Sequence, residues 1–108
     1  MADMKNIFAK KVINLKSSIE YQENSIVSKI ITTNKISSLT LFAFDKGQVI
    51  ESHSAPVDAV VQAIEGEVEI TISGEKFNLK EGDMILMPKS EPHELEAKTK
   101  FKMALFKI

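Results

Sequence analysis

Apolar and polar residues alternate along much of this chain with a period of two. The stretch EVEITI, residues 67–72, is the clearest example, because Val68, Ile70 and Ile72 alternate with polar residues. Such alternation predicts a β-strand with one buried face. Other stretches rich in β-branched and aromatic residues predict further strands: SIVSKIITT (25–33), SSLTLFAF (37–44), DMILM (83–87) and FKMALFKI (101–108).

The last predicted strand has two different faces. Phe101, Met103 and Leu105 share the apolar face, whereas Lys100 and Lys102 fall on the other and are expected to be solvated. Methionines at 84, 87 and 103 are expected to pack in the core or to line an internal cavity, since thioethers adapt to varied neighbours.

Turn residues are concentrated in the middle of the chain. All four glycines and all three prolines lie between residues 47 and 92, so they punctuate one tightly turned region. The sequence SGE, residues 73–75, turns EVEITI into a hairpin with KFNL. Strands at such short intervals predict an all-β sandwich or barrel.

The amino-terminal region follows neither the strand period nor the helix period. In residues 4–24 we expect an extended lead-in with about one helical turn. Residues 1–35 are accordingly predicted to form lead-in strands that pair at an edge, and residues 36–108 to form the barrel domain. Because small β domains gain stability by covering their sheet edges, we expect a homodimer built from the amino-terminal strands and an apolar outer sheet face.

Composition narrows the function. The chain has 108 residues, no cysteine and a formal charge of −1, which predicts one globular domain without disulfides or a thiol nucleophile. All fourteen positive residues are lysines and form no basic stripe, so nucleic acid is not an expected partner. No apolar run suits a membrane span, and MADMKNIFAKK lacks the features of a signal peptide, so a cytoplasmic location is expected.

The stretch GQVIESHSAPVDAVVQAIEG, residues 47–66, resembles the first motif of the cupins, GxxxxxHxHxxxxExxxxxxG with three or four residues before the glutamate. Gly47, His53 and Gly66 match this pattern. Ala55 stands where the second histidine is expected, and Ala59 stands where the glutamate is expected.

The second cupin motif, GxxxxxPxGxxHxxxN, is matched by GDMILMPKSEPHELEA, residues 82–97. Gly82, Pro88 and His93 fall at the expected spacing, whereas Ser90 and Ala97 replace the inner glycine and the asparagine. The resemblance covers about residues 36–108 and implies a cupin-type jelly-roll β-barrel.

The two histidines are the candidate site. Strand parity places Glu51, His53 and Ala55 on one face, and in a cupin arrangement His93 would converge on His53. Two imidazoles make half of a divalent metal site, which usually has three or four protein ligands. Glu51 is either a third ligand or a solvated residue near the start of a strand.

These residues leave two readings of the pocket. In the first, His53, His93 and Glu51 bind a small organic ligand in the barrel, with no metal. In the second, His53 and His93 hold a divalent metal (Zn, Fe, Mn or Ni) weakly, and binding is lost below about pH 6 because the imidazoles must be neutral. We expect a largely metal-free small-molecule-binding protein. The alternative implied by the resemblance is a metal-dependent enzyme of the dioxygenase or isomerase type.

Overall fold

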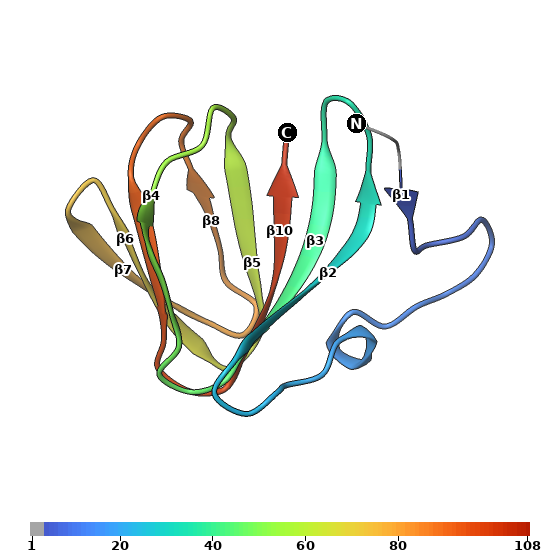
Figure 1. Ribbon diagram of the computed structural model, residues 1–108, viewed down its shortest axis with the longest axis horizontal. Helices are drawn as coiled ribbons and strands as arrows, with labels where there is room; N and C mark the ends of the chain where they lie inside the picture. Colours follow the sequence, from blue (N-terminus) through green and yellow to red (C-terminus); the bar gives the residue numbers. More distant parts are fainter. Residues whose placement is uncertain (1–3) are drawn as a thin grey trace.

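The computed structural model describes residues 4–108, so the first three residues of the expected lead-in lie outside it. Within this range ten strands and one short 3-10 helix form (Figure 1). The strands are β1 (Met4–Lys5), β2 (Ile26–Thr33), β3 (Ser38–Phe44), β4 (Val49–His53), β5 (Ala59–Glu65), β6 (Glu67–Ile72), β7 (Glu75–Lys80), β8 (Met84–Met87), β9 (His93–Ala97) and β10 (Phe101–Lys107), and the helix is η1 (Lys16–Ser18). The all-β prediction is confirmed.

The strands form two antiparallel sheets that face each other across the core, as in a jelly-roll barrel (Figure 1). The six-stranded sheet has the order β1-β2-β3-β10-β5-β8, and the four-stranded sheet has the order β4-β9-β6-β7. Strand β10, the last in the sequence, lies between β3 and β5, to which it is paired along both edges. It is therefore a central strand of its sheet.

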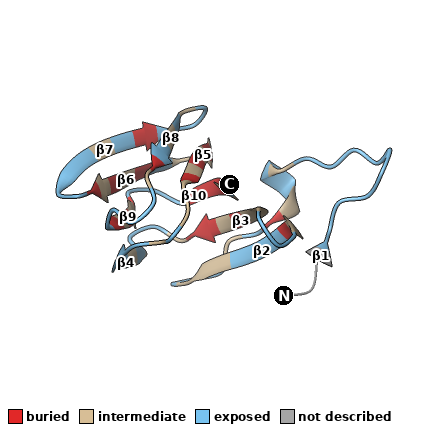
Figure 2. Ribbon diagram, turned by 90° about the horizontal axis from the view of Figure 1, so that it is seen from above, coloured by how far each residue is buried: buried red, intermediate tan, exposed pale blue. Residues whose placement is uncertain are grey.

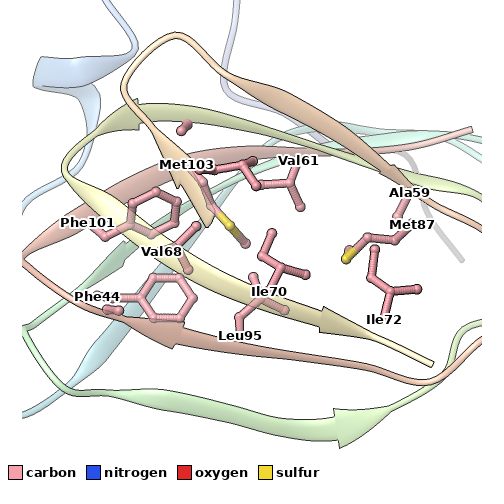
Figure 3. Close-up of a cluster of buried hydrophobic side chains, with 13 residues drawn as sticks. Phe44, Ala59, Val61, Val68, Ile70, Ile72, Met87, Leu95, Phe101 and Met103 are labelled. Atoms are coloured by element: carbon pink, nitrogen blue, oxygen red, sulfur yellow. The ribbon is translucent and has the colours of Figure 1, made fainter. Parts of the chain in front are cut away.

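The main core fills the space between the sheets, where apolar side chains from both sheets converge (Figure 3). Val68, Ile70 and Ile72 of β6 all belong to it, which confirms the face that the alternation of EVEITI predicts. Phe44 and Phe101 meet edge to face with ring centroids 5.6 Å apart, a favourable geometry for two aromatic rings. Both rings are fully buried.

A second apolar cluster covers the outer face of the six-stranded sheet. Residues of the amino-terminal segment, Leu15, Ile19 and Tyr21, pack there on side chains that include Leu41 and Ala104. Because Ala104 points outward while Met103 points into the main core, β10 is buried on both faces. The segment is thus part of the folded domain.

The expectation that Lys102 is solvated is wrong, because the same segment covers it. Lys102 is only 8% exposed, and its ammonium donates a hydrogen bond of 2.6 Å to the carbonyl of Lys16. Nearby, the hydroxyl of Tyr21 donates to the carboxylate of Glu65. Burial and this carboxylate raise the pKa of Tyr21 well above its usual value, so the hydroxyl stays protonated and able to donate.

The amino-terminal region has the predicted extended character, with η1 as its helical turn. Strand β2, which lies within residues 1–35, pairs with β3 over most of its length and extends the six-stranded sheet. Strand β1 pairs only with Thr32 and Thr33 of β2. Across residues 4–108, no helix has the length and apolar character that crossing a membrane would require.

Candidate functional site

His53 and His93 meet because β4 and β9 are neighbours in the four-stranded sheet. His53 ends β4, His93 begins β9, and the two residues are directly paired in the ladder. Their Nε2 atoms lie 3.2 Å apart, and their ring centroids 4.4 Å apart with an interplanar angle of 72°. The structure therefore brings together the two histidines that the sequence separates by forty positions.

A β-bulge in β4 determines which residues accompany His53. Ile50 is paired with Leu95 and His53 with His93, so three steps along β4 correspond to two along β9. The extra residue reverses the alternation of faces, as bulges do. Ile50 and His53 consequently line the same cavity, and Glu51 does not.

Because of this bulge, Glu51 does not lie on the face that the sequence predicts for it. Simple parity puts its side chain on the face of His53, but Glu51 is exposed and lies outside the cavity wall. Its backbone carbonyl does take part, because it lies 3.0 Å from Nδ1 of His53. Glu51 therefore orients the ring of His53 through its main chain.

The hydrogen bonds specify the tautomers of the pair. A carbonyl oxygen only accepts, so Nδ1 of His53 carries a hydrogen and its Nε2 has a free lone pair in the neutral ring. The 3.2 Å contact is then a hydrogen bond in which Nε2 of His93 donates to Nε2 of His53. This leaves Nδ1 of His93 as an acceptor, and that atom is buried without a hydrogen-bond partner in the described chain.

The surroundings of His93 disfavour its protonation. The residue is only 5% exposed, and this burial is the largest cause of a pKa below the usual value for histidine. His53 and Lys107 lower the pKa further, whereas the backbone of Glu91 opposes the shift without making a hydrogen bond of ordinary geometry to Nδ1. His93 is therefore neutral at neutral pH.

The histidine pair opens into a cavity of about 430 Å³ between the two sheets. Its wall includes residues from β3, β4, β5, β8, β9 and β10, as well as the loop that follows β4. Nine of the lining residues are apolar: Phe42, Ile50, Ala55, Pro56, Ala59, Met87, Leu95, Met103 and Leu105. The other four are His53, Ser54, His93 and Lys107. This size and this mostly apolar wall with a few polar groups are typical of small-molecule sites.

Two of the polar lining residues, Lys107 and Ser54, were not singled out by the sequence patterns. Lys107 continues the row of Phe101, Met103 and Leu105 along β10, so its parity carried a signal that it faces the same interior. Ser54 lies in the loop after the bulge, where strand parity gives no guidance. Of the three methionines, Met87 and Met103 are in the core and line the cavity, whereas Met84 is 58% exposed.

The donor set does not fit a catalytic metal centre. Ala55 and Ala59 line the cavity beside the histidines, so methyl groups occupy the two positions where the cupin motif has its other ligands. Among residues 4–108, no group of three or more His, Cys, Asp or Glu side chains is placed to hold a metal ion. Catalytic zinc sites ordinarily use three protein ligands, and only two are present here.

Comparisons with known proteins agree with this architecture. Residues 40–108 match the family described as the cupin domain. A conserved protein of unknown function from Streptococcus pyogenes is 35% identical, with a TM-score of 0.91, and the match covers 100% of this chain and 95% of that one. A cupin superfamily protein from Desulfitobacterium hafniense is 26% identical, with a TM-score of 0.90 over 96% of this chain and 95% of that one.

A cupin 2 conserved barrel domain protein from Leptotrichia buccalis is 37% identical, with a TM-score of 0.86. That match covers 89% of this chain and 47% of the other, so this chain corresponds to about half of that protein. No curated protein matches the sequence. The family match, which spans residues 40–108 and so more than half of the chain, shows that this protein belongs to the cupin family.

Proposed function

We propose that this protein binds a small, largely apolar organic molecule in the barrel cavity, with a polar group of the ligand meeting the His53–His93 pair. The cavity supports this proposal by its volume of about 430 Å³ and its mostly apolar wall. The observation that carries it is His93, a residue only 5% exposed that lines this wall and whose Nδ1 has no hydrogen-bond partner among residues 4–108. A buried polar atom without a partner costs free energy, which a ligand that pairs with the imidazoles would offset.

A fragment screen by thermal shift tests this proposal. A ligand present at ten times its dissociation constant stabilises the folded state by about 1.4 kcal/mol, which shifts the melting temperature by several degrees in a domain of this size. We expect such hits with the wild type, and we expect Ala55→Phe, which fills the cavity, to abolish them.

Asn78→Phe is the control, because Asn78 is an exposed residue of β7 outside the cavity wall. It should bind the hits as the wild type does. Hits that stabilise Ala55→Phe as much as the wild type, or a complete lack of hits at millimolar concentration, would contradict the proposal.

A second candidate is weak binding of a divalent metal through the two histidines. Two Nε2 atoms 3.2 Å apart can both be reached from one metal by bonds of about 2.0–2.1 Å. With no third protein donor, water or a ligand would have to complete the coordination shell, so such a site would be weak. The dioxygenase or isomerase alternative requires a firmly held metal or an acid–base group beyond these imidazoles, and it therefore ranks below binding.

A further inference from the structure

The charge of the cavity wall is entirely positive. Lys107 is the lining residue with a permanent charge at neutral pH, and none of the lining residues is a carboxylate. The remaining polar lining groups are Ser54, whose hydroxyl can donate, and the two imidazoles, whose N–H groups already bond to the Glu51 carbonyl and to Nε2 of His53. A ligand in this cavity therefore meets one positive charge and one hydroxyl donor, and no lining residue carries a negative charge to balance the lysine.

Lys107 lies at the end of β10 that adjoins the histidine pair. It is paired with Ala59 of β5 and Ser38 of β3, and Ala59 is itself a lining residue. The side chain of Lys107 is exposed, so it stands where the cavity meets solvent, whereas Met103 and Leu105 on the same strand face lie deeper. The wall thus changes from apolar to cationic along one strand.

From this arrangement we infer that the ligand is a small organic acid, whose carboxylate lies near Lys107 and whose apolar body lies among Phe42, Met103 and Leu105. This inference rests on the proposed function and specifies its ligand class. A carboxylate accepts charge-assisted hydrogen bonds from an ammonium, and these are about twice as strong as neutral ones. An ammonium ligand would meet Lys107 as a like charge and would find no carboxylate to pair with.

Three probes with six carbon atoms each and different terminal groups test the inference: hexanoate, hexan-1-ol and hexylammonium. They are titrated by calorimetry near neutral pH and at low salt into protein freed of metal by a chelator, so that a bound metal does not hold the carboxylate. We expect hexanoate to bind roughly tenfold more tightly than hexan-1-ol, the difference between a charge-assisted and a neutral hydrogen bond. Hexylammonium should bind more weakly than either.

Variants of Lys107 show whether this charge selects the acid. Lys107→Gln should weaken hexanoate roughly tenfold and leave hexan-1-ol unchanged, and Lys107→Arg should retain hexanoate binding, since both predictions follow the charge. Lys80→Gln is the matched control, because Lys80 is an exposed lysine of β7 outside the cavity wall, and it should change nothing.

The outcomes separate the two proposals. Equal affinity for hexanoate and hexan-1-ol, or unchanged hexanoate binding by Lys107→Gln, would overturn the acid inference and leave a binding cavity without charge preference. Failure of all three probes to bind would also overturn the acid inference, while the fragment screen with Ala55→Phe decides independently on the cavity as a binding site.

Discussion

At the scale of single residues, Ala55 and Ala59 determine how well the histidine pair can hold a metal ion. Both line the cavity with His53 and His93, and Ala59 is only 2% exposed. They supply methyl groups at the places where a metal needs lone pairs. Without further ligands beside them, His53 and His93 contact each other through their Nε2 atoms.

We predict that Ala55→His combined with Ala59→Glu raises the affinity for a divalent metal by restoring a four-donor set. The buried carboxylate at position 59 should destabilise the metal-free variant, because an unpaired buried charge is costly, and added Zn²⁺ should restore the stability. Titration with a competing chelator measures the affinity, and thermal unfolding with and without Zn²⁺ measures the coupling.

His53→Ala supplies the control for this prediction. It should abolish metal binding in the wild type and weaken it strongly in the double variant. Metal binding should also be lost as the pH falls below about 6, because imidazoles must be neutral to coordinate a metal. The lowered pKa of His93 keeps its ring neutral at neutral pH. Tight metal that survives both a chelator and His53→Ala would place the metal site elsewhere.

At the scale of elements, the turn between β5 and β6 depends on Gly66. This residue has φ of +82°, in the left-handed region, and a Cβ built on it would lie 1.9 Å from the carbonyl oxygen of Lys100. Gly82 has a similar φ of +94°, but its added Cβ would meet nothing within 4 Å. Comparing alanine substitutions at the two glycines therefore separates the free-energy cost of the backbone conformation from the cost of the close contact.

We predict that Gly82→Ala lowers the free energy of unfolding by about 1–2 kcal/mol, the cost of the left-handed conformation for a residue with a Cβ. Gly66→Ala should lower it by roughly 3 kcal/mol or more, because the overlap with the Lys100 carbonyl adds an overpacking cost of about 1–3 kcal/mol. Urea denaturation of both variants measures the difference. Equal destabilisation would show that the turn moves freely away from Lys100.

The elements also show how far sequence patterns reach. Alternation predicts β6 and its buried face correctly, because that strand is regular and has one face in the core. Parity fails for Glu51 because the bulge in β4 adds a residue between Ile50 and His53, and neither glycine nor proline marks it there. For Lys102, parity gives the correct outer face, but the expected solvation is wrong because a distant segment covers that face, which no local pattern of β10 records.

At the scale of the whole molecule, the amino-terminal segment divides into a packed part and a projecting part. Residues 15–21 pack on the outer sheet face, whereas the segment that follows β1 extends away from both sheets and is exposed (Figure 2). This projecting arm, defined here as residues 6–14, carries four exposed apolar side chains. Their exposed fractions are 38% for Ile7, 65% for Phe8, 99% for Val12 and 37% for Ile13.

We predict a homodimer in which this arm packs against a second copy of the chain, because isolated apolar side chains at such exposure gain free energy by burial. β1 and Asn6 cover the outer edge of β2 only from Ile30 to Thr33, so the first half of that edge is left for a partner. Sedimentation at tens of micromolar should show a dimer. Phe8→Ser combined with Val12→Ser should shift it towards monomer without unfolding the barrel.

Ile36→Ser is the control for the arm, since Ile36 is 82% exposed but belongs to the turn between β2 and β3. It should leave the dimer intact. A wild-type monomer at these concentrations would refute the predicted assembly.

The central position of β10 bears on how the protein reaches its folded state during synthesis. Residues 101–107 leave the ribosome after every other strand, yet they join β3 to β5 and supply Met103, Leu105 and Lys107 to the cavity. Without β10, the strand order of the six-stranded sheet is interrupted between β3 and β5. Because this closure pairs residues far apart in sequence, it is intrinsically slow. The nascent chain therefore has neither its complete sheet nor its binding cavity until the last strand inserts, and the two appear together.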